Sequence, residues 1–161
     1  MEGEVADHPT ANLITLAGIA CSVVAITLAL RGQYPGCAVA LVGAFLADVI
    51  DGPVAARTSG RSADQGAFGA NLDSLADMVS AGAALGVVVA SYGHFAAGYI
   101  VVAVVLACAS ALRLSYFNVH GLDADSRAYT GLPTDQVVLA VVTLMLLAVP
   151  LAAAHLARLL G

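Results

Sequence analysis

Lysine is absent from this sequence, and charged residues of all kinds occupy only 11% of its 161 positions. The six basic residues are all arginines, and the eleven acidic residues set against them leave a formal net charge of −5. Because no basic patch is long enough to hold a phosphate backbone, we expect no nucleic-acid partner. The first ten residues are acidic and contain no basic segment, so we expect no cleavable signal peptide.

Cysteine is scarce as well, and its three copies lie in or beside apolar runs: Cys21, Cys37 and Cys108. They lack the C-x-x-C spacing of metal and redox sites, so we interpret them as small buried apolar side chains. Apolar residues instead make up 60% of the chain, and the mean hydropathy is +0.92. This composition predicts an integral membrane protein, and we expect a single domain over residues 1–161.

Several apolar runs are long enough to cross the roughly 30 Å hydrocarbon core of a bilayer as helices. They cover the ranges 11–30, 37–55, 68–91, 95–114 and 137–156. The segments between them are polar or rich in glycine and proline, which is typical of turns. We therefore expect an all-α, polytopic transmembrane helix bundle with five spans.

Two pairs of aspartates mark the ends of the second and third runs. Asp48 and Asp51 are three residues apart, and Asp73 and Asp77 are four apart, so on helices each pair shares a face. A carboxylate that faces hydrocarbon is costly, so each pair must face protein, water or a cation. Antiparallel spans joined by a short loop bring both pairs to one side of the membrane. There they can form a cage of oxygen ligands, which suits Mg²⁺, Mn²⁺ or Ca²⁺, and we expect Mg²⁺ or Mn²⁺ as the cofactor.

The aspartates have two other interpretations. Asp73 and Asp77 are placed where carboxylates cap a helix or offset its dipole, although Asp48 and Asp51 lie near a helix C-terminus, where the dipole disfavours them. A divalent-cation transporter would also use aspartates. It would need them near the bilayer midplane on several helices, and the other apolar runs contain none.

The spacing of this stretch resembles the signature of the CDP-alcohol phosphatidyltransferase family, Asp-x2-Asp-Gly-x2-Ala-Arg-x8-Gly-x3-Asp-x3-Asp. The matching positions are Asp48, Asp51, Gly52, Ala55, Gly69, Asp73 and Asp77. Two features depart from the signature: Ala56 stands in the arginine position, and four additional residues fall in the loop-like range 58–65. The family has six spans, so the resemblance implies that one is lost here or supplied by a partner subunit.

The resemblance implies an enzyme that transfers a phosphatidyl-type group from a CDP-linked lipid to a small alcohol and releases CMP. It implies that Asp48, Asp51 and Asp73 are metal ligands. Asp77 would be the general base that takes the alcohol proton, and it would also touch a second metal ion.

The resemblance also implies the contacts of the CDP group. Gly52 and Gly69 have no Cβ and would let the backbone approach the nucleotide, while Ala55 would pack near the cytosine. Arg57 would hold phosphate oxygens only if its helix ended early, because a shift of one residue turns a helical side chain by about 100°. Arg61 in the lengthened loop is the alternative.

Three further segments resemble the phosphatidylserine synthase branch of the family, in the ranges 72–80, 111–118 and 131–134. They imply L-serine as the acceptor, with glycerol phosphate or inositol phosphate as the alternative. Arg113 would meet the carboxylate of serine or a lipid phosphate, and Asn118 would add a polar contact. Arg113 is equally well explained as an interfacial anchor.

Near the start of the chain, Asn12 and Thr15 resemble the family's first-helix Asn-x-x-Thr. Helix capping by Asn12 explains this pair nearly as well.

The arginines predict the orientation in the cell membrane. Four of them, Arg57, Arg61, Arg113 and Arg127, fall on the side of the aspartates, whereas Arg31 and Arg158 fall on the other. The excess places the aspartates on the cytoplasmic face. Because five thin helices are few to enclose a lipid-binding cavity, we also expect a homodimer.

Overall fold

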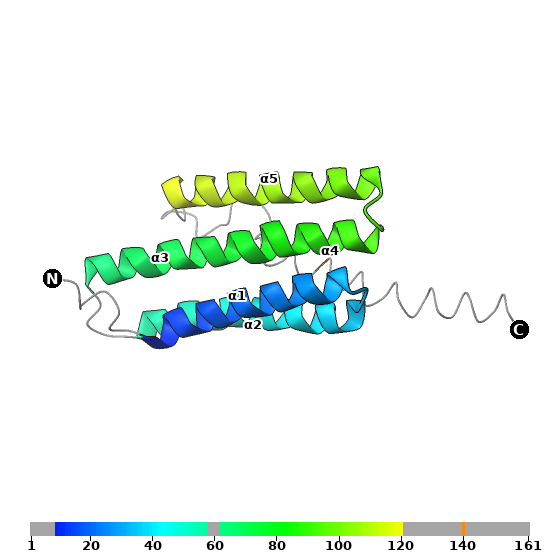
Figure 1. The fold of residues 1–161 in the computed structure, drawn as a ribbon. Coiled ribbons are helices and arrows are strands. Elements are labelled where there is room, and N and C mark those ends of the chain that lie inside the picture. Colours follow the sequence, from blue (N-terminus) through cyan, green and yellow to red (C-terminus); the bar gives the residue numbers. More distant parts are fainter. Residues whose placement is uncertain (1–8, 58–61, 121–139, 141–161) are drawn as a thin grey trace, which may run out of the picture.

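The computed structural model describes residues 9–57, 62–120 and 140, and within these ranges its regular structure is entirely helical. The helices are α1 (Pro9–Leu30), α2 (Tyr34–Arg57), α3 (Ala63–Asp77), the π-helix η1 (Met78–Ala84), α4 (Leu85–Tyr92) and α5 (Ala97–His120). The all-α class that the sequence predicts is therefore confirmed. Since α3, η1 and α4 follow one another without a break, they form one long rod (Figure 1).

In the described ranges, four helical segments are long and apolar enough to cross a membrane: Thr10–Leu30, Tyr34–Arg57, Ala63–Tyr92 and Ala97–Val119. They correspond to the first four spans that the sequence predicts, and they make the chain a multi-pass membrane protein. The fifth predicted span, 137–156, lies outside the described residues.

The helices stack in layers, as Figure 1 shows. Helix α1 packs against α2 and against the rod formed by α3, η1 and α4, while α5 covers the rod from the opposite side. Because neighbouring helices run in opposite directions, the start of α1, the end of α2, the start of α3 and the end of α5 lie at the same end of the bundle (Figure 1). This arrangement brings the two aspartate pairs toward the same end, as the sequence predicts, although Asp77 lies halfway along the rod Ala63–Tyr92.

Small side chains dominate the core, which lets the helix backbones approach closely. The buried cluster comprises Ala25, Ala29, Cys37, Ala38, Leu41, Ala81, Ala84, Leu85 and Val88. The expectation of buried cysteines is confirmed for Cys37 but is wrong for Cys108, which lies exposed on α5.

Hydrogen bonds join three helices at the end of the bundle away from the aspartates. The Tyr34 hydroxyl donates to the Ser91 carbonyl at 2.9 Å, and the Ser91 hydroxyl donates to the Ala29 carbonyl at 2.7 Å. Each satisfies a polar group that would otherwise be costly to bury in an apolar bundle. This end is therefore held together by polar contacts as well as by packing.

Helix α3 begins earlier than the apolar run indicates, because Ser62 and Gln65 form a capping box. The Gln65 amide donates to the Ser62 hydroxyl at 3.2 Å, and the Ser62 amide donates to the Gln65 side-chain oxygen at 2.9 Å. The prediction of a loop up to residue 65 is thus wrong from Ala63 onward. The Ser-x-x-Gln spacing was the available signal.

Helix α1 also begins earlier than expected, at Pro9. Asn12 therefore lies inside the first turns rather than at the N-cap, and its interpretation as a helix cap is wrong. Its side chain is instead available to the cavity described below.

Candidate functional site

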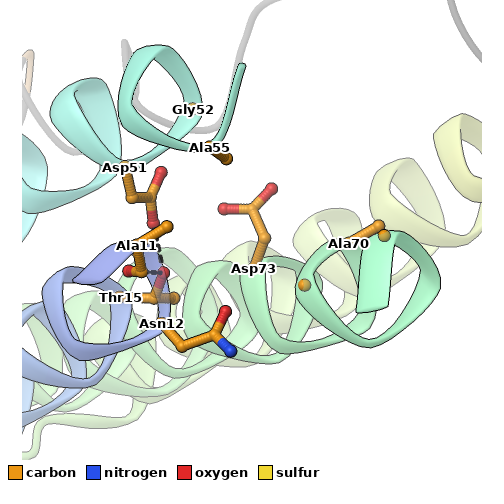
Figure 2. A pocket seen from close by; sticks show the side chains of 10 residues that line it. Ala11, Asn12, Thr15, Asp51, Gly52, Ala55, Ala70 and Asp73 are labelled. Carbon is orange, nitrogen blue, oxygen red and sulfur yellow. Dashed lines mark hydrogen bonds between the residues drawn. The ribbon is translucent and has the colours of Figure 1, made fainter. Parts of the chain in front are cut away.

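A cavity of about 220 Å³ opens at the end of the bundle where α1 starts, α2 ends and α3 starts (Figure 2). Residues from all three helices line it: Ala11, Asn12, Thr15, Asp51, Gly52, Ala55, Gly66, Gly69, Ala70 and Asp73. Five of the residues that the sequence marks as functional are among them, namely Asp51, Gly52, Ala55, Gly69 and Asp73.

The carboxylates of Asp51 and Asp73 reach this cavity from different helices. Figure 2 shows Asp51 on α2 and Asp73 on α3 directed toward the same space, with Ala55 beside it. Asp51 is buried, with 6% of its surface exposed, whereas Asp73 lies open to the cavity. One aspartate of each pair therefore lines the same cavity, Asp51 from α2 and Asp73 from α3.

The remaining two aspartates lie close by but outside this cavity. Asp48 lines a smaller neighbouring hollow together with Asp51 and Thr15. Asp48 and Asp51 are both near enough to Asp73 for their negative charges to act on it. Asp77 is half-buried one helical turn beyond Asp73, and the Ser80 hydroxyl donates to its backbone carbonyl at 3.3 Å.

The donor atoms around the cavity fit a divalent cation. Carboxylate oxygens are the ligands that Mg²⁺ and Mn²⁺ prefer, and two of them point into a shared open volume with a third carboxylate near. In the part of the chain that the structure describes, no three acidic, histidine or cysteine side chains stand close enough to one another to hold an ion. Water or phosphate oxygens would therefore complete the coordination of an ion held by the two carboxylates.

Glycine leaves the α3 side of the cavity open. A Cβ added to Gly66 would meet no protein atom within 4 Å, so packing does not require glycine at this position. Gly66 was not expected in the site, because the spacing to the aspartates selects Gly69 instead. The signal that could have found it is helical spacing, since residues 66, 69, 70 and 73 share one face of α3.

Helix α1 contributes two polar side chains, Asn12 and Thr15, which lie one turn apart and both line the cavity. The Thr15 hydroxyl donates a hydrogen bond of 2.5 Å to Oδ2 of Asp51 (Figure 2). The first helix thus contacts the second through the carboxylate itself.

The structure does not bring Arg57 into the cavity. Helix α2 continues to Arg57, so the early helix end that this residue would need to hold phosphate oxygens does not occur in this structure. Its side chain is exposed and is not among the cavity-lining residues. Arg61 lies outside the described residues.

The two residues predicted to contact the acceptor lie on α5, outside the cavity lining. Asn118 accepts a hydrogen bond of 3.1 Å from the hydroxyl of Ser74, which directly follows Asp73 on α3. Arg113 is partly buried on the same helix, five residues before Asn118. The end of α5 is therefore tied to the helix that carries Asp73 and Asp77.

Comparisons with known proteins indicate the same family that the aspartate spacing resembles. The family model of CDP-alcohol phosphatidyltransferases matches residues 9–160. The chain is 33% identical over 123 residues to an archaetidylserine synthase of Methanothermobacter thermautotrophicus, and the match covers 76% of this chain and 51% of that protein. The chain thus spans about half the length of this curated relative. No solved structure matches it.

Proposed function

Because the chain belongs to the CDP-alcohol phosphatidyltransferase family, we propose that it transfers a phosphatidyl-type group from a CDP-linked lipid to L-serine and releases CMP. Such a reaction is a step of phospholipid biosynthesis, and a multi-pass membrane protein has direct access to a lipid donor. Helices capable of spanning a membrane form the walls of the candidate site, which agrees with a substrate that stays in the bilayer.

The observation that carries the proposal is the pairing of Asp51 and Asp73 in one open cavity. A CDP group brings two phosphates, and these carboxylates alone would repel them. Among the described residues that line the cavity there is no arginine to offset this charge. A bound Mg²⁺ or Mn²⁺ would offset the carboxylate charge and would supply a positive centre for the phosphate oxygens during transfer.

The side chains divide into ligands and a base in this proposal. Asp48, Asp51 and Asp73 hold the cation, while Asp77 accepts the proton of the serine hydroxyl. The serine oxygen attacks the phosphorus that carries the lipid, and the bond from this phosphorus to the CMP oxygen breaks. CMP leaves with the bonding electrons. Gly52, Ala55 and Gly69 contact the CDP group, and Arg113 and Asn118 are placed for the acceptor.

The choice of serine is supported by the archaetidylserine synthase relative and by the three sequence segments that resemble the phosphatidylserine synthase branch. A panel of acceptors tests it. Purified chain is supplied with a CDP-linked lipid, Mn²⁺ or Mg²⁺, and serine, glycerol phosphate or inositol phosphate, and CMP release is measured. We expect release with serine, none in excess EDTA, and recovery when the cation is restored. Release with a phosphorylated alcohol but not with serine would overturn the acceptor assignment.

Two aspartate variants control this assay. Asp77→Asn removes the proposed base, and we expect CMP release to fall by about a hundred-fold or more. Asp64→Asn removes a charge from the same helix at an exposed position outside the cavity, and we expect wild-type release. Equal rates for the two variants would show that Asp77 is not the base.

We further propose that the enzyme is a homodimer in the cell membrane, with the cavity on the cytoplasmic face. Helix α5 supports the proposal of a dimer. None of its membrane-spanning residues is buried within the described part of the chain, so this helix has surface that a second copy could cover. The described arginines support the orientation, since Arg57 at the end of α2 and Arg113 in the second half of α5 lie toward the cavity end, whereas Arg31 lies at the opposite end.

A further inference from the structure

Thr15 holds one oxygen of Asp51 by a short hydrogen bond between α1 and α2. The donor–acceptor distance is 2.5 Å, and both side chains are largely buried, with 7% of Thr15 and 6% of Asp51 exposed. Hydroxyl groups that donate to an ionised carboxylate form bonds of this length, and these are about twice as strong as bonds between neutral groups. The contact therefore restrains the carboxylate more than a surface hydrogen bond would.

Thr15 differs in this respect from two other hydroxyl residues of α1. Ser22 and Thr27 donate to carbonyls one turn back on their own helix, at 3.0 Å to Gly18 and 2.9 Å to Val23. The Thr15 hydroxyl also lies 3.1 Å from the Ala11 carbonyl, but it has a single proton. The shorter distance and the negative charge of Asp51 direct that proton to the carboxylate.

The position of Thr15 makes this bond part of the site. Thr15 lines both the main cavity and the smaller hollow that contains Asp48, and Asp51 lines both as well. With Oδ2 of Asp51 held by Thr15, the second carboxylate oxygen remains for the cavity. Figure 2 shows the bond from α1 reaching Asp51 on the side away from Gly52.

We propose that Thr15 is a positioning residue, which fixes the orientation of the Asp51 carboxylate so that Asp51 and Asp73 present oxygens to one divalent cation. This inference rests on the proposed function, which places a cation between these carboxylates. Helix α1 then shapes the metal site without supplying a ligand. Hydrogen bonds to metal-binding carboxylates and imidazoles typically contribute about ten- to a hundred-fold to metal affinity.

Binding of Mn²⁺ to the full-length chain in detergent, followed by the electron paramagnetic resonance signal of free Mn²⁺, tests the proposal without any turnover. Thr15→Val keeps the branched shape and removes the hydroxyl, and we expect its affinity for Mn²⁺ to fall by about ten- to a hundred-fold. Thr15→Ser keeps the hydroxyl and should bind nearly as wild type does. Thr27→Val loses a hydroxyl from the same helix away from the cavity and should leave binding unchanged.

The outcomes separate this inference from the proposed function. If wild type binds Mn²⁺ and Thr15→Val binds it equally well, Thr15 does not position Asp51, and the metal site stands. If wild type binds no Mn²⁺, the proposed cation is wrong, and the role of Thr15 fails with it. Thermal unfolding of each variant checks the fold. Should Thr15→Val not fold, Thr15→Ala removes the same hydroxyl and carries the same expectation.

Discussion

Some residues of the cavity matter because they have no side chain and so leave space for a ligand. Gly66 has no protein atom within 4 Å of where its Cβ would be, yet it lines the cavity. Gly52 is a poorer test of ligand space. Pro53 follows it, and a proline disfavours the helical backbone conformation in a preceding residue that has a Cβ, so a substitution of Gly52 would also disturb the fold. Gly66 is therefore the position at which space for a ligand can be separated from the needs of the fold.

Gly66→Ala should stabilise the chain and weaken its binding of the donor. Alanine in place of a helical glycine gains about 0.5–1 kcal/mol of stability, while the new methyl group occupies the cavity. Overpacking by a methyl typically costs about 1–3 kcal/mol, so we expect affinity for the CDP-linked lipid to fall by about tenfold or more. Gly98→Ala on α5 is the matched control, because its Cβ also meets nothing within 4 Å and it lies outside the cavity. Equal donor affinities for both variants would exclude a ligand contact at Gly66.

Residues of the site that follow helical periodicity could be predicted from the sequence, whereas those brought in by packing could not. The spacing of the aspartates predicted that Asp51 and Asp73 face a common site, because each pair must share a helix face, whereas Gly52 was implied by the family resemblance. The bond between Thr15 and Asp51 joins positions 36 residues apart, and no local pattern gives the packing of α1 against α2.

The position at which helix α2 ends determines which arginine could contact the phosphates of the proposed donor. Pro53 has no amide proton to donate to the Val49 carbonyl, which weakens the hydrogen bonding of the last turns, but the helix continues to Arg57. Ala55 lines the cavity, and a side chain two positions later is rotated by about 200°. In this geometry, Arg57 faces away from the side that Ala55 presents.

Arg57→Ala should therefore change donor affinity by less than about fivefold, which is the range of an exposed charge. The measurement compares CDP-linked lipid binding by Arg57→Ala, Arg61→Ala and wild type. A loss of tenfold or more in Arg57→Ala would show that the last turn of α2 unwinds when the donor binds. A loss confined to Arg61→Ala would move the phosphate contact into the loop.

Helix existence was more predictable than helix boundaries. The apolar runs located α1, α2, the rod and α5, because crossing a bilayer requires long apolar segments. The polar start of α3 depends on the capping box of Ser62 and Gln65, which hydropathy does not register. The π-helix Met78–Ala84 directly after Asp77 was not expected either. Its composition is that of an ordinary apolar helix, and such segments are frequent at functional sites.

At the scale of the whole molecule, the two ends of the bundle differ. One end is joined by the hydrogen bonds of Tyr34 and Ser91 to neighbouring helices, and the buried core lies toward it. The other end holds the cavity and the aspartates (Figures 1 and 2). An end joined by hydrogen bonds and an end that opens into a cavity agree with the proposed enzyme, which would admit both a lipid and a water-soluble acceptor at the membrane surface.

The arginines predict how the chain lies in the membrane, with the cavity end on the cytoplasmic side. Ala63 is exposed at the start of α3 on the cavity end, and Gln33 is exposed between α1 and α2 on the opposite end. Single cysteines at these positions, in a background with Cys21, Cys37 and Cys108 replaced by alanine, report on each side.

Because more arginines lie toward the cavity end than toward the opposite end, we expect a membrane-impermeant maleimide to label Gln33→Cys in intact cells. Ala63→Cys should react only after the membrane is permeabilised. Retained CMP release by the cysteine-free background confirms that the protein tested is folded. The reverse labelling pattern would place the cavity on the outer face and would contradict the proposed orientation.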